Sequence, residues 1–259
     1  MDIQITKEIL ELDDIKVEAF LFLPKSSQEP FKHGAIFTHG YTSHKSVLVP
    51  WASKIVDRNI PTLIFDLPGH FLGSFNEAPS FDSFKVNAPK LFEVARNLIN
   101  KRSNQEIPFY FIGGHSLGAL VSLLSLKDLR LESNQKLAIG VGFGAPPENI
   151  THIFDTPFFK KTMEIRKQLV SKSLDPKTIL PWIRDTKNSN MIKNQRIHLI
   201  SGQDDVIVGK NGLDRLIDHL ESSGNKVSFD KPKNLPHHLP ENGSTHISHF
   251  IKKFIEENS

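Results

Sequence analysis

The chain has 259 residues, of which 38% are hydrophobic, and its formal net charge is +3. This length and apolar content are sufficient for a full buried core, and the small net charge gives no case for a nucleic-acid partner. The absence of cysteine excludes disulfides, thiol catalysis and cysteine metal sites. No run approaches the roughly 20 apolar residues that span a bilayer, and no signal peptide is visible, so we expect a soluble, cytoplasmic protein.

Short apolar runs alternate with helical patterns along most of the chain. Two runs near the N-terminus, residues 4–10 and 16–23, are separated by a turn sequence and predict a hairpin. Further strands are predicted at residues 34–38, 62–65, 109–112, 137–143, 196–200 and 227–229. Helices are predicted at residues 46–58, 84–100, 117–126, 213–222 and 245–256. The alternation predicts an α/β fold, with a mostly parallel sheet and helices on both faces.

One segment, residues 148–194, does not follow this alternation, because it has no clear strand and is mixed in polarity. It lies between two predicted core strands, and a long excursion at such a place is typical of a functional lid. We therefore expect a single domain, residues 1–259, with a short helical lid at 148–194. The lid carries large apolar side chains, of which Phe158, Phe159 and Trp182 are predicted to bind substrate. The alternative for each is that it only fastens the lid to the domain.

The sequence Gly114-His115-Ser116-Leu117-Gly118 follows a predicted strand and opens a predicted helix. Strand, sharp turn and helix form the context of a G-x-S-x-G nucleophile elbow. A serine at the apex of so tight a turn has strained backbone, and its neighbours two positions away come too close for a side chain. The helix that follows directs N–H groups toward any oxyanion formed there. A glycine-rich turn that only packs is the alternative, and the flanking strand and helix disfavour it.

With this elbow the chain resembles the α/β-hydrolase family, in which the acid follows the nucleophile and the histidine comes last. The resemblance makes Ser116 the nucleophile. Asp205, at the end of a predicted strand, resembles the family's Gly-x-x-Asp acid, and Asp204 is the alternative. His238, in a His-x-Pro sequence before the last helix, is favoured as the base, and the adjacent His237 fits almost as well.

The resemblance also implies an oxyanion hole made of two backbone N–H groups. One comes from Leu117, the residue after the nucleophile. The other comes from Tyr41, in a His-Gly-x loop after an early strand. A second motif, the sequence Asp-Leu-Pro-Gly-His at residues 66–70, matches a family pattern that holds the neighbouring loops. Only the segment 148–194 has no matching motif.

The family branches that the chain resembles include carboxylesterases, monoglyceride-lipase-like enzymes and serine aminopeptidase-like hydrolases. Such enzymes need no metal or organic cofactor. The resemblance therefore implies a serine hydrolase that cleaves small-molecule carboxylic esters, with short to medium acyl chains or a monoacyl lipid, through an acyl-enzyme. The alternatives are an acyltransferase or peptidase on the same triad, or a non-catalytic binding protein on this fold. The sequence leaves the oligomeric state open.

Overall fold

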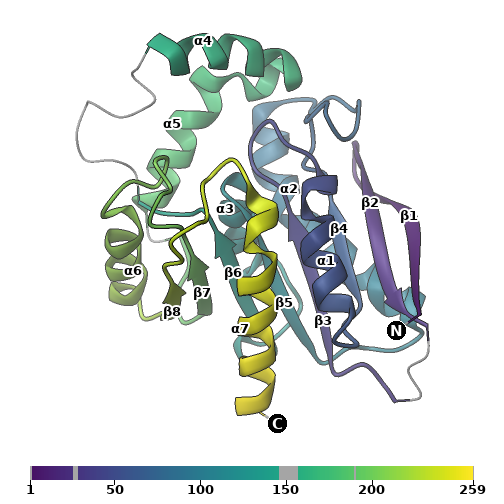
Figure 1. Cartoon of the computed structure of the whole chain (residues 1–259). Helices are drawn as coiled ribbons and strands as arrows, with labels where there is room; N and C mark the ends of the chain where they lie inside the picture. The colour runs from purple at the N-terminus through teal and green to yellow at the C-terminus, as the bar shows by residue number, and fades with distance from the viewer. Residues whose placement is uncertain (1, 26–28, 146–156, 190, 259) are drawn as a thin grey trace.

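A mixed β-sheet organises the molecule, which we describe from a computed structural model covering residues 2–25, 29–145, 157–189 and 191–258. The sheet has eight strands in the order β1-β2-β4-β3-β5-β6-β7-β8 (Figure 1). The strands are β1 (Ile3–Leu12), β2 (Ile15–Pro24), β3 (His33–Thr38), β4 (Thr62–Phe65), β5 (Phe109–His115), β6 (Lys136–Val141), β7 (Arg196–Ile200) and β8 (Lys226–Asp230).

The first two strands form the predicted hairpin, with β1 antiparallel to β2, and β2 in turn antiparallel to β4. Every other neighbouring pair in the sheet is parallel. Parallel strands need a crossover, and the helices between them supply it. The prediction of a mostly parallel sheet is confirmed. Its consequence for function is that the carboxyl ends of β3 to β8 meet at one edge of the sheet.

Helices cover both faces of the sheet (Figure 1). The helices are α1 (Val49–Val56), α2 (Phe81–Ser103), α3 (Leu117–Ser125), α4 (Pro157–Arg166), α5 (Pro176–Lys187), α6 (Gly212–Ser222) and α7 (Ser244–Glu257). One buried cluster joins α1 and α7 to the sheet and includes Trp51 and Ile247. The other joins α2, α3 and α6 to the opposite face and includes Phe92, Leu120 and Leu216. The apolar stripes of these helices therefore build a core on each side of the sheet.

Two helices differ in extent from their predictions for identifiable reasons. The segment predicted as helix 46–58 is a short 3-10 turn, Lys45–Leu48, followed by α1, with a proline in the first turn of α1. Helix α2 extends beyond the predicted 84–100 at both ends. Ser80 caps its first turn by accepting a hydrogen bond from the Ser83 N–H, and Asn104 ends it in the left-handed conformation with φ 53°.

The described part of the insertion contains α4, α5 and two 3-10 turns, and it lies at the top of the molecule in Figure 1. Its middle is attached to the loop after β4, because the Phe71 N–H donates to the Leu169 carbonyl and the Ser171 N–H to the Gly69 carbonyl, both at 2.9 Å. Residues 146–156, which include Phe154, lie outside the described residues. No helix in the described residues is long and apolar enough to cross a membrane.

Candidate active site

Ser116 is the single residue that connects β5, which ends at His115, to α3, which begins at Leu117. Its backbone has φ 52° and ψ −109°, a conformation that costs a residue with a side chain about 1–3 kcal/mol. The Ser116 N–H donates to the carbonyl of Val141 in the adjacent strand β6 at 2.9 Å. The strained turn lifts the hydroxyl out of the strand, and the side chain remains half-buried rather than enclosed.

Two glycines permit this turn. A Cβ atom on Gly114 would lie 2.5 Å from the carbonyl carbon of Gly118, and one on Gly118 would lie 2.4 Å from the carbonyl oxygen of Thr38. Real Cβ atoms do not approach backbone atoms so closely, so both positions exclude a side chain. This is the crowding predicted from the sequence on either side of the serine.

A hydrogen-bonded chain of three side chains includes Ser116. The Nε2 atom of His237 lies 3.1 Å from the Ser116 Oγ atom, and its Nδ1 atom lies 2.9 Å from the Oδ2 atom of Asp205. An ionised carboxylate only accepts hydrogen bonds, so Nδ1 carries the proton and Nε2 is left to accept one from the serine. The three residues come from the elbow and from the loops after β7 and β8, all at the carboxyl edge of the sheet.

Of the two candidate histidines, the structure places His237, the alternative to the favoured His238, beside the serine. His238 is exposed. The loop is fixed just before the pair, where Leu235 is buried and its N–H donates to the Oδ1 atom of Asp204 at 3.0 Å. A turn in which the Leu239 N–H donates to the Pro236 carbonyl follows at once. Between these two constraints, His237 faces the elbow and His238 faces solvent.

The two adjacent aspartates have different partners. Asp205 is buried, and its Oδ1 atom accepts hydrogen bonds from the N–H groups of Ile207 at 3.0 Å and Val208 at 2.9 Å. These donors hold the carboxylate so that Oδ2 faces the histidine. Asp204 points instead to the backbone of Leu235 and braces the loop that carries the histidine. Asp205 is thus the aspartate of the pair that the structure brings to His237.

Three further histidines near the elbow are buried and neutral. Burial lowers the pKa of His115 well below its ordinary value, and its ring lies 4.7 Å from the ring of His237. Burial likewise lowers the pKa of His39 and of His70 to about 3. His39 donates from Nδ1 to the Gly40 carbonyl and accepts from the Leu67 N–H at Nε2, so it ties the loop after β3 to the loop after β4. The two predicted loop motifs are therefore in contact.

The two predicted oxyanion-hole residues come from the elbow and from the loop after β3. Leu117 is the first residue of α3, so its N–H belongs to the unpaired first turn of a helix. Tyr41 follows β3, and its hydroxyl donates to the Leu174 carbonyl in the insertion at 2.8 Å. Burial raises the pKa of this hydroxyl above its ordinary value. Their backbone roles toward an oxyanion stay predictions.

The predicted substrate-binding side chains of the insertion have different surroundings. The ring of Trp182 packs edge-on against Phe81 at 5.8 Å and Phe84 at 6.1 Å, both in α2. Trp182 thus fastens α5 to the body of the molecule, which was the alternative role for each of these residues. Phe159 is half-buried. The side chain of Phe158 lies outside the described residues.

Lys187, the last residue of α5, was not found from the sequence. Its Nζ atom lies 4.3 Å from the centre of the Phe143 ring. Burial lowers the pKa of Lys187 to about 8, and the carboxylate of Asp205 acts in the opposite direction. No local pattern marks this lysine, because the contact joins the insertion to the loop after β6. Among the described residues, no group of three or more histidine, aspartate or glutamate side chains could hold a metal ion.

Comparison with known proteins supplies the fold. No protein-family model matches the sequence, and no curated protein matches it. Solved structures do match over almost the whole chain. One is a lipase described as an open form, with a TM-score of 0.68 and 13% identity over 99% of both chains. Another is an esterase from Pyrococcus furiosus, with a TM-score of 0.62 and 16% identity over 96% of this chain and 92% of that one.

The chain has the α/β-hydrolase fold. A further similar structure, Est1E from Butyrivibrio proteoclasticus, has a TM-score of 0.60 and 15% identity over 96% of this chain and 99% of that chain. The identities are too low to carry more than the fold. The elbow of this chain and the side chains around it therefore carry the evidence for an activity.

Proposed function

We propose that the protein is a serine hydrolase that cleaves carboxylic esters through an acyl-enzyme. The observation that carries the proposal is the hydrogen-bonded chain from Ser116 through His237 to Asp205, with the serine on a strained elbow. A nucleophile, a base and an orienting carboxylate are the parts that acyl transfer by serine needs. The sequence supplies them in the order serine, aspartate, histidine, which is the order of this fold.

In the first half of the reaction, His237 accepts the hydroxyl proton of Ser116 at Nε2 while the serine oxygen bonds to the ester carbonyl carbon. The carbonyl π-bond electrons move to oxygen and form the oxyanion. Asp205 accepts the Nδ1–H throughout, which fixes the tautomer and stabilises the imidazolium. His237 then gives its Nε2 proton to the departing alkoxide, the carbon–oxygen bond breaks, and the acyl group remains on the serine.

In the second half, water repeats the attack on the acyl-serine. His237 accepts a proton from the water at Nε2, and the hydroxide oxygen bonds to the acyl carbon. Collapse of this intermediate breaks the bond to the serine oxygen, which takes the proton back from His237. The products are the carboxylic acid and free enzyme. We assign the oxyanion in both halves to the backbone N–H groups of Leu117 and Tyr41.

The proposed substrate class is a small-molecule ester with a short to medium acyl chain or a monoacyl lipid. The apolar side chains of the insertion support this class, and half-buried Phe159 is one of them. Each further CH₂ group of a buried acyl chain would contribute about 0.8 kcal/mol. We therefore expect kcat/KM on p-nitrophenyl esters to rise with acyl length from acetate until the site is full.

Replacing Phe158 and Phe159 together by alanine should flatten this dependence on acyl length more than it lowers the rate on acetate. Trp182→Ala is the comparison variant, because its ring packs on α2 and its loss should lower thermal stability instead. An unchanged chain-length profile in the double variant would remove the support for a lipid-like substrate while leaving the esterase proposal intact.

Reaction with a fluorophosphonate probe tests the activity itself. We expect one label per chain on Ser116, located by peptide mass spectrometry, together with turnover of p-nitrophenyl esters. Absence of both labelling and turnover would favour a binding protein on this fold. Labelling without hydrolysis, with faster product release when an alcohol or amine is added, would favour an acyltransferase.

A further inference from the structure

The edge strand β8 is unpaired on its outer side among the described residues, because β7 is its one neighbour in the sheet. An unprotected edge is a template for pairing with another chain. The strand consists of Lys226, Val227, Ser228, Phe229 and Asp230. Phe229 is 47% exposed, so its ring is available to pack against a strand added at this edge.

The hydrogen bonds to β7 show which backbone groups of β8 are used. The Lys226 N–H donates to the Gln195 carbonyl at 2.9 Å, and the Asp230 carbonyl accepts from the Ser201 N–H at 3.2 Å. Backbone groups alternate in direction along a strand. The N–H and C=O groups of Val227 and Phe229 therefore point outward, to the open edge.

We propose that two copies of this chain associate through β8, paired antiparallel with Ser228 on the two-fold axis. In this register Val227 lies opposite Phe229 of the second copy, and their outward backbone groups form the closely spaced hydrogen-bonded pairs of an antiparallel ladder. Lys226 lies opposite Asp230 of the second copy. Because the interface is isologous, each of these pairs occurs twice.

The chemistry of the strand selects this register. Shifting the register by two residues, which is one repeat of the ladder, sets Ser228 opposite Lys226 or Asp230. In neither shifted register does Lys226 lie opposite Asp230. The register centred on Ser228 pairs both charges and both apolar side chains. Opposite charges and apolar pairs directly across two strands are the stabilising combinations. A self-complementary strand of this kind fits a second copy of itself better than an unrelated partner.

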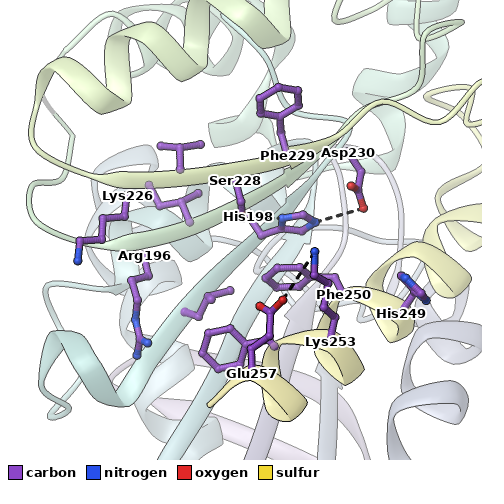
Figure 2. A pocket seen from close by; sticks show the side chains of 14 residues that line it. Arg196, His198, Lys226, Ser228, Phe229, Asp230, His249, Phe250, Lys253 and Glu257 are labelled. Carbon is purple, nitrogen blue, oxygen red and sulfur yellow. Dashed lines mark hydrogen bonds and ion pairs between the residues drawn. The ribbon is translucent and has the colours of Figure 1, made fainter.

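The charged pairs and the apolar pairs of this interface lie on opposite faces of β8. Successive side chains of a strand point to opposite faces, so Lys226, Ser228 and Asp230 share one face of β8, beside a pocket of about 430 Å³ between β7, β8 and α7 that Phe229 also helps to line (Figure 2). Asp230 lies 3.5 Å from the Nε2 atom of His198, whereas Lys226 makes no ion pair within the described part of the chain. The second copy would supply the missing carboxylate. On the other face, Phe229 and half-buried Val227 would cover each other.

The pairing leaves the candidate active site open. Ser116 lies at the carboxyl ends of the strands, and antiparallel pairing of two sheets sets these ends on opposite sides of the dimer. Dissociation should therefore leave kcat/KM on an ester unchanged. The inference does not depend on the proposed function, and an inactive protein would test it equally well.

Sedimentation velocity on the full chain over a range of concentrations gives the first test. We expect a species of twice the 29.3 kDa chain mass. Lys226→Asp sets aspartate opposite aspartate twice, and Asp230→Lys sets lysine opposite lysine twice. Each variant alone should dissociate about tenfold more readily or worse, since like charges directly opposite are destabilising. Lys233→Asp, an exposed lysine beyond the strand, is the matched control and should remain dimeric.

Mixing the two variants gives the decisive test. In a heterodimer of Lys226→Asp with Asp230→Lys, both cross-strand pairs again join opposite charges, so the mixture should associate where each variant alone does not. A wild-type monomer at all concentrations overturns the proposal. A dimer that both variants leave intact, or a mixture that stays monomeric, overturns it as well. Melting curves check that each variant is folded. Because Lys226 is exposed, Lys226→Asp should fold normally and tests the interface by itself even if Asp230→Lys does not fold.

Discussion

In two clusters among the described residues, a histidine side chain contacts both a serine and an aspartate. In the candidate active site, His237 lies 3.1 Å from the Ser116 hydroxyl and 2.9 Å from Asp205. The second cluster lies at the edge of the sheet, between β7, β8 and α7 (Figure 2). Its histidine, His198, lies 2.9 Å from the Ser228 hydroxyl and 3.5 Å from Asp230. The composition of the two clusters is the same, so composition cannot distinguish their roles.

The backbone distinguishes them. Ser116 has φ 52° and precedes the first turn of a helix, where unpaired N–H groups can receive an oxyanion. Ser228 lies in the middle of a strand, and its own N–H is directed to β7. The ring of His198 is stacked on Phe250 at 3.5 Å, and burial lowers its pKa. The second cluster therefore contains a hydroxyl and an imidazole, but its serine does not precede a helix whose unpaired N–H groups could stabilise an oxyanion.

The largest expected effect separates the two serines. Ser116→Ala should reduce ester turnover by several orders of magnitude, because it removes the atom that bonds to the substrate. Ser228→Ala should leave kcat/KM within about twofold, since we assign no substrate contact to that hydroxyl. Rates of ester hydrolysis and fluorophosphonate labelling of both variants measure the difference between the two serines. Substantial turnover by Ser116→Ala would place the nucleophile elsewhere and reverse the comparison.

The next effect separates two adjacent histidines. His237→Ala should lower kcat by several orders of magnitude, because Ser116 then has no base at 3.1 Å. His238→Ala, which removes an exposed side chain, should cost less than a factor of about ten. The measurement is kcat for both variants at the same pH, with a melting curve for each. Equal losses would mean that both histidines contact the reacting groups.

The architecture could be predicted from the sequence, and the choice within the histidine pair could not. Alternating apolar runs and helical patterns indicate a parallel sheet because burial on both faces imposes those patterns. Ser116 could be proposed from the sequence because the chemistry of a serine nucleophile needs a local backbone turn that glycine permits. The direction of His237 depends instead on Leu235 being buried and bound by Asp204, which is a contact across more than 30 positions of sequence.

The second cluster and Lys187 lie beyond sequence prediction for the same reason. His198 meets Ser228 because β7 and β8 pair in a register that sets these two residues side by side. No residue spacing within either strand predicts the contact between His198 and Ser228. Lys187 meets the Phe143 ring only because the insertion returns to the sheet beside the loop after β6. Local patterns predict elements, whereas these sites depend on how distant elements are positioned.

A smaller effect is expected from the acids. Asp205→Asn should lower kcat by about 10²–10⁴-fold, because an amide can hold the histidine in the wrong tautomer and cannot stabilise the imidazolium. Asp204→Asn should change kcat little, since an amide oxygen can still accept the hydrogen bond of the Leu235 N–H. Steady-state rates across pH 6 to 9 measure both. A larger loss in Asp204→Asn would show that the loop brace matters more than the carboxylate beside His237.

The smallest expected effect concerns Lys187, a half-buried cation at the end of α5 whose charge acts on Asp205 of the first cluster. The folded-state pKa of about 8 lies below the ordinary lysine value of 10.5. Between these two values the unfolded chain binds more protons than the folded chain, so the free energy of unfolding rises with pH across that window. Below pH 8 both states are protonated, and the full cost of burying the cation is present. Above pH 10.5 both states are neutral and the cost is absent.

Lys187→Met removes this titration while keeping an apolar side chain of similar length against Phe143. At pH 7 we expect the variant to be more stable by on the order of 1 kcal/mol, because the contact of the cation with the aromatic ring offsets part of the burial cost. The difference should shrink as the pH approaches 10.5, when the wild-type amine is neutral. Lys233→Met, at an exposed position, should show no such convergence. Thermal unfolding of the three proteins at pH 7 and pH 10 measures this. A wild-type protein that is the more stable at pH 7 would mean that the cation is held favourably, by Asp205 and the ring together.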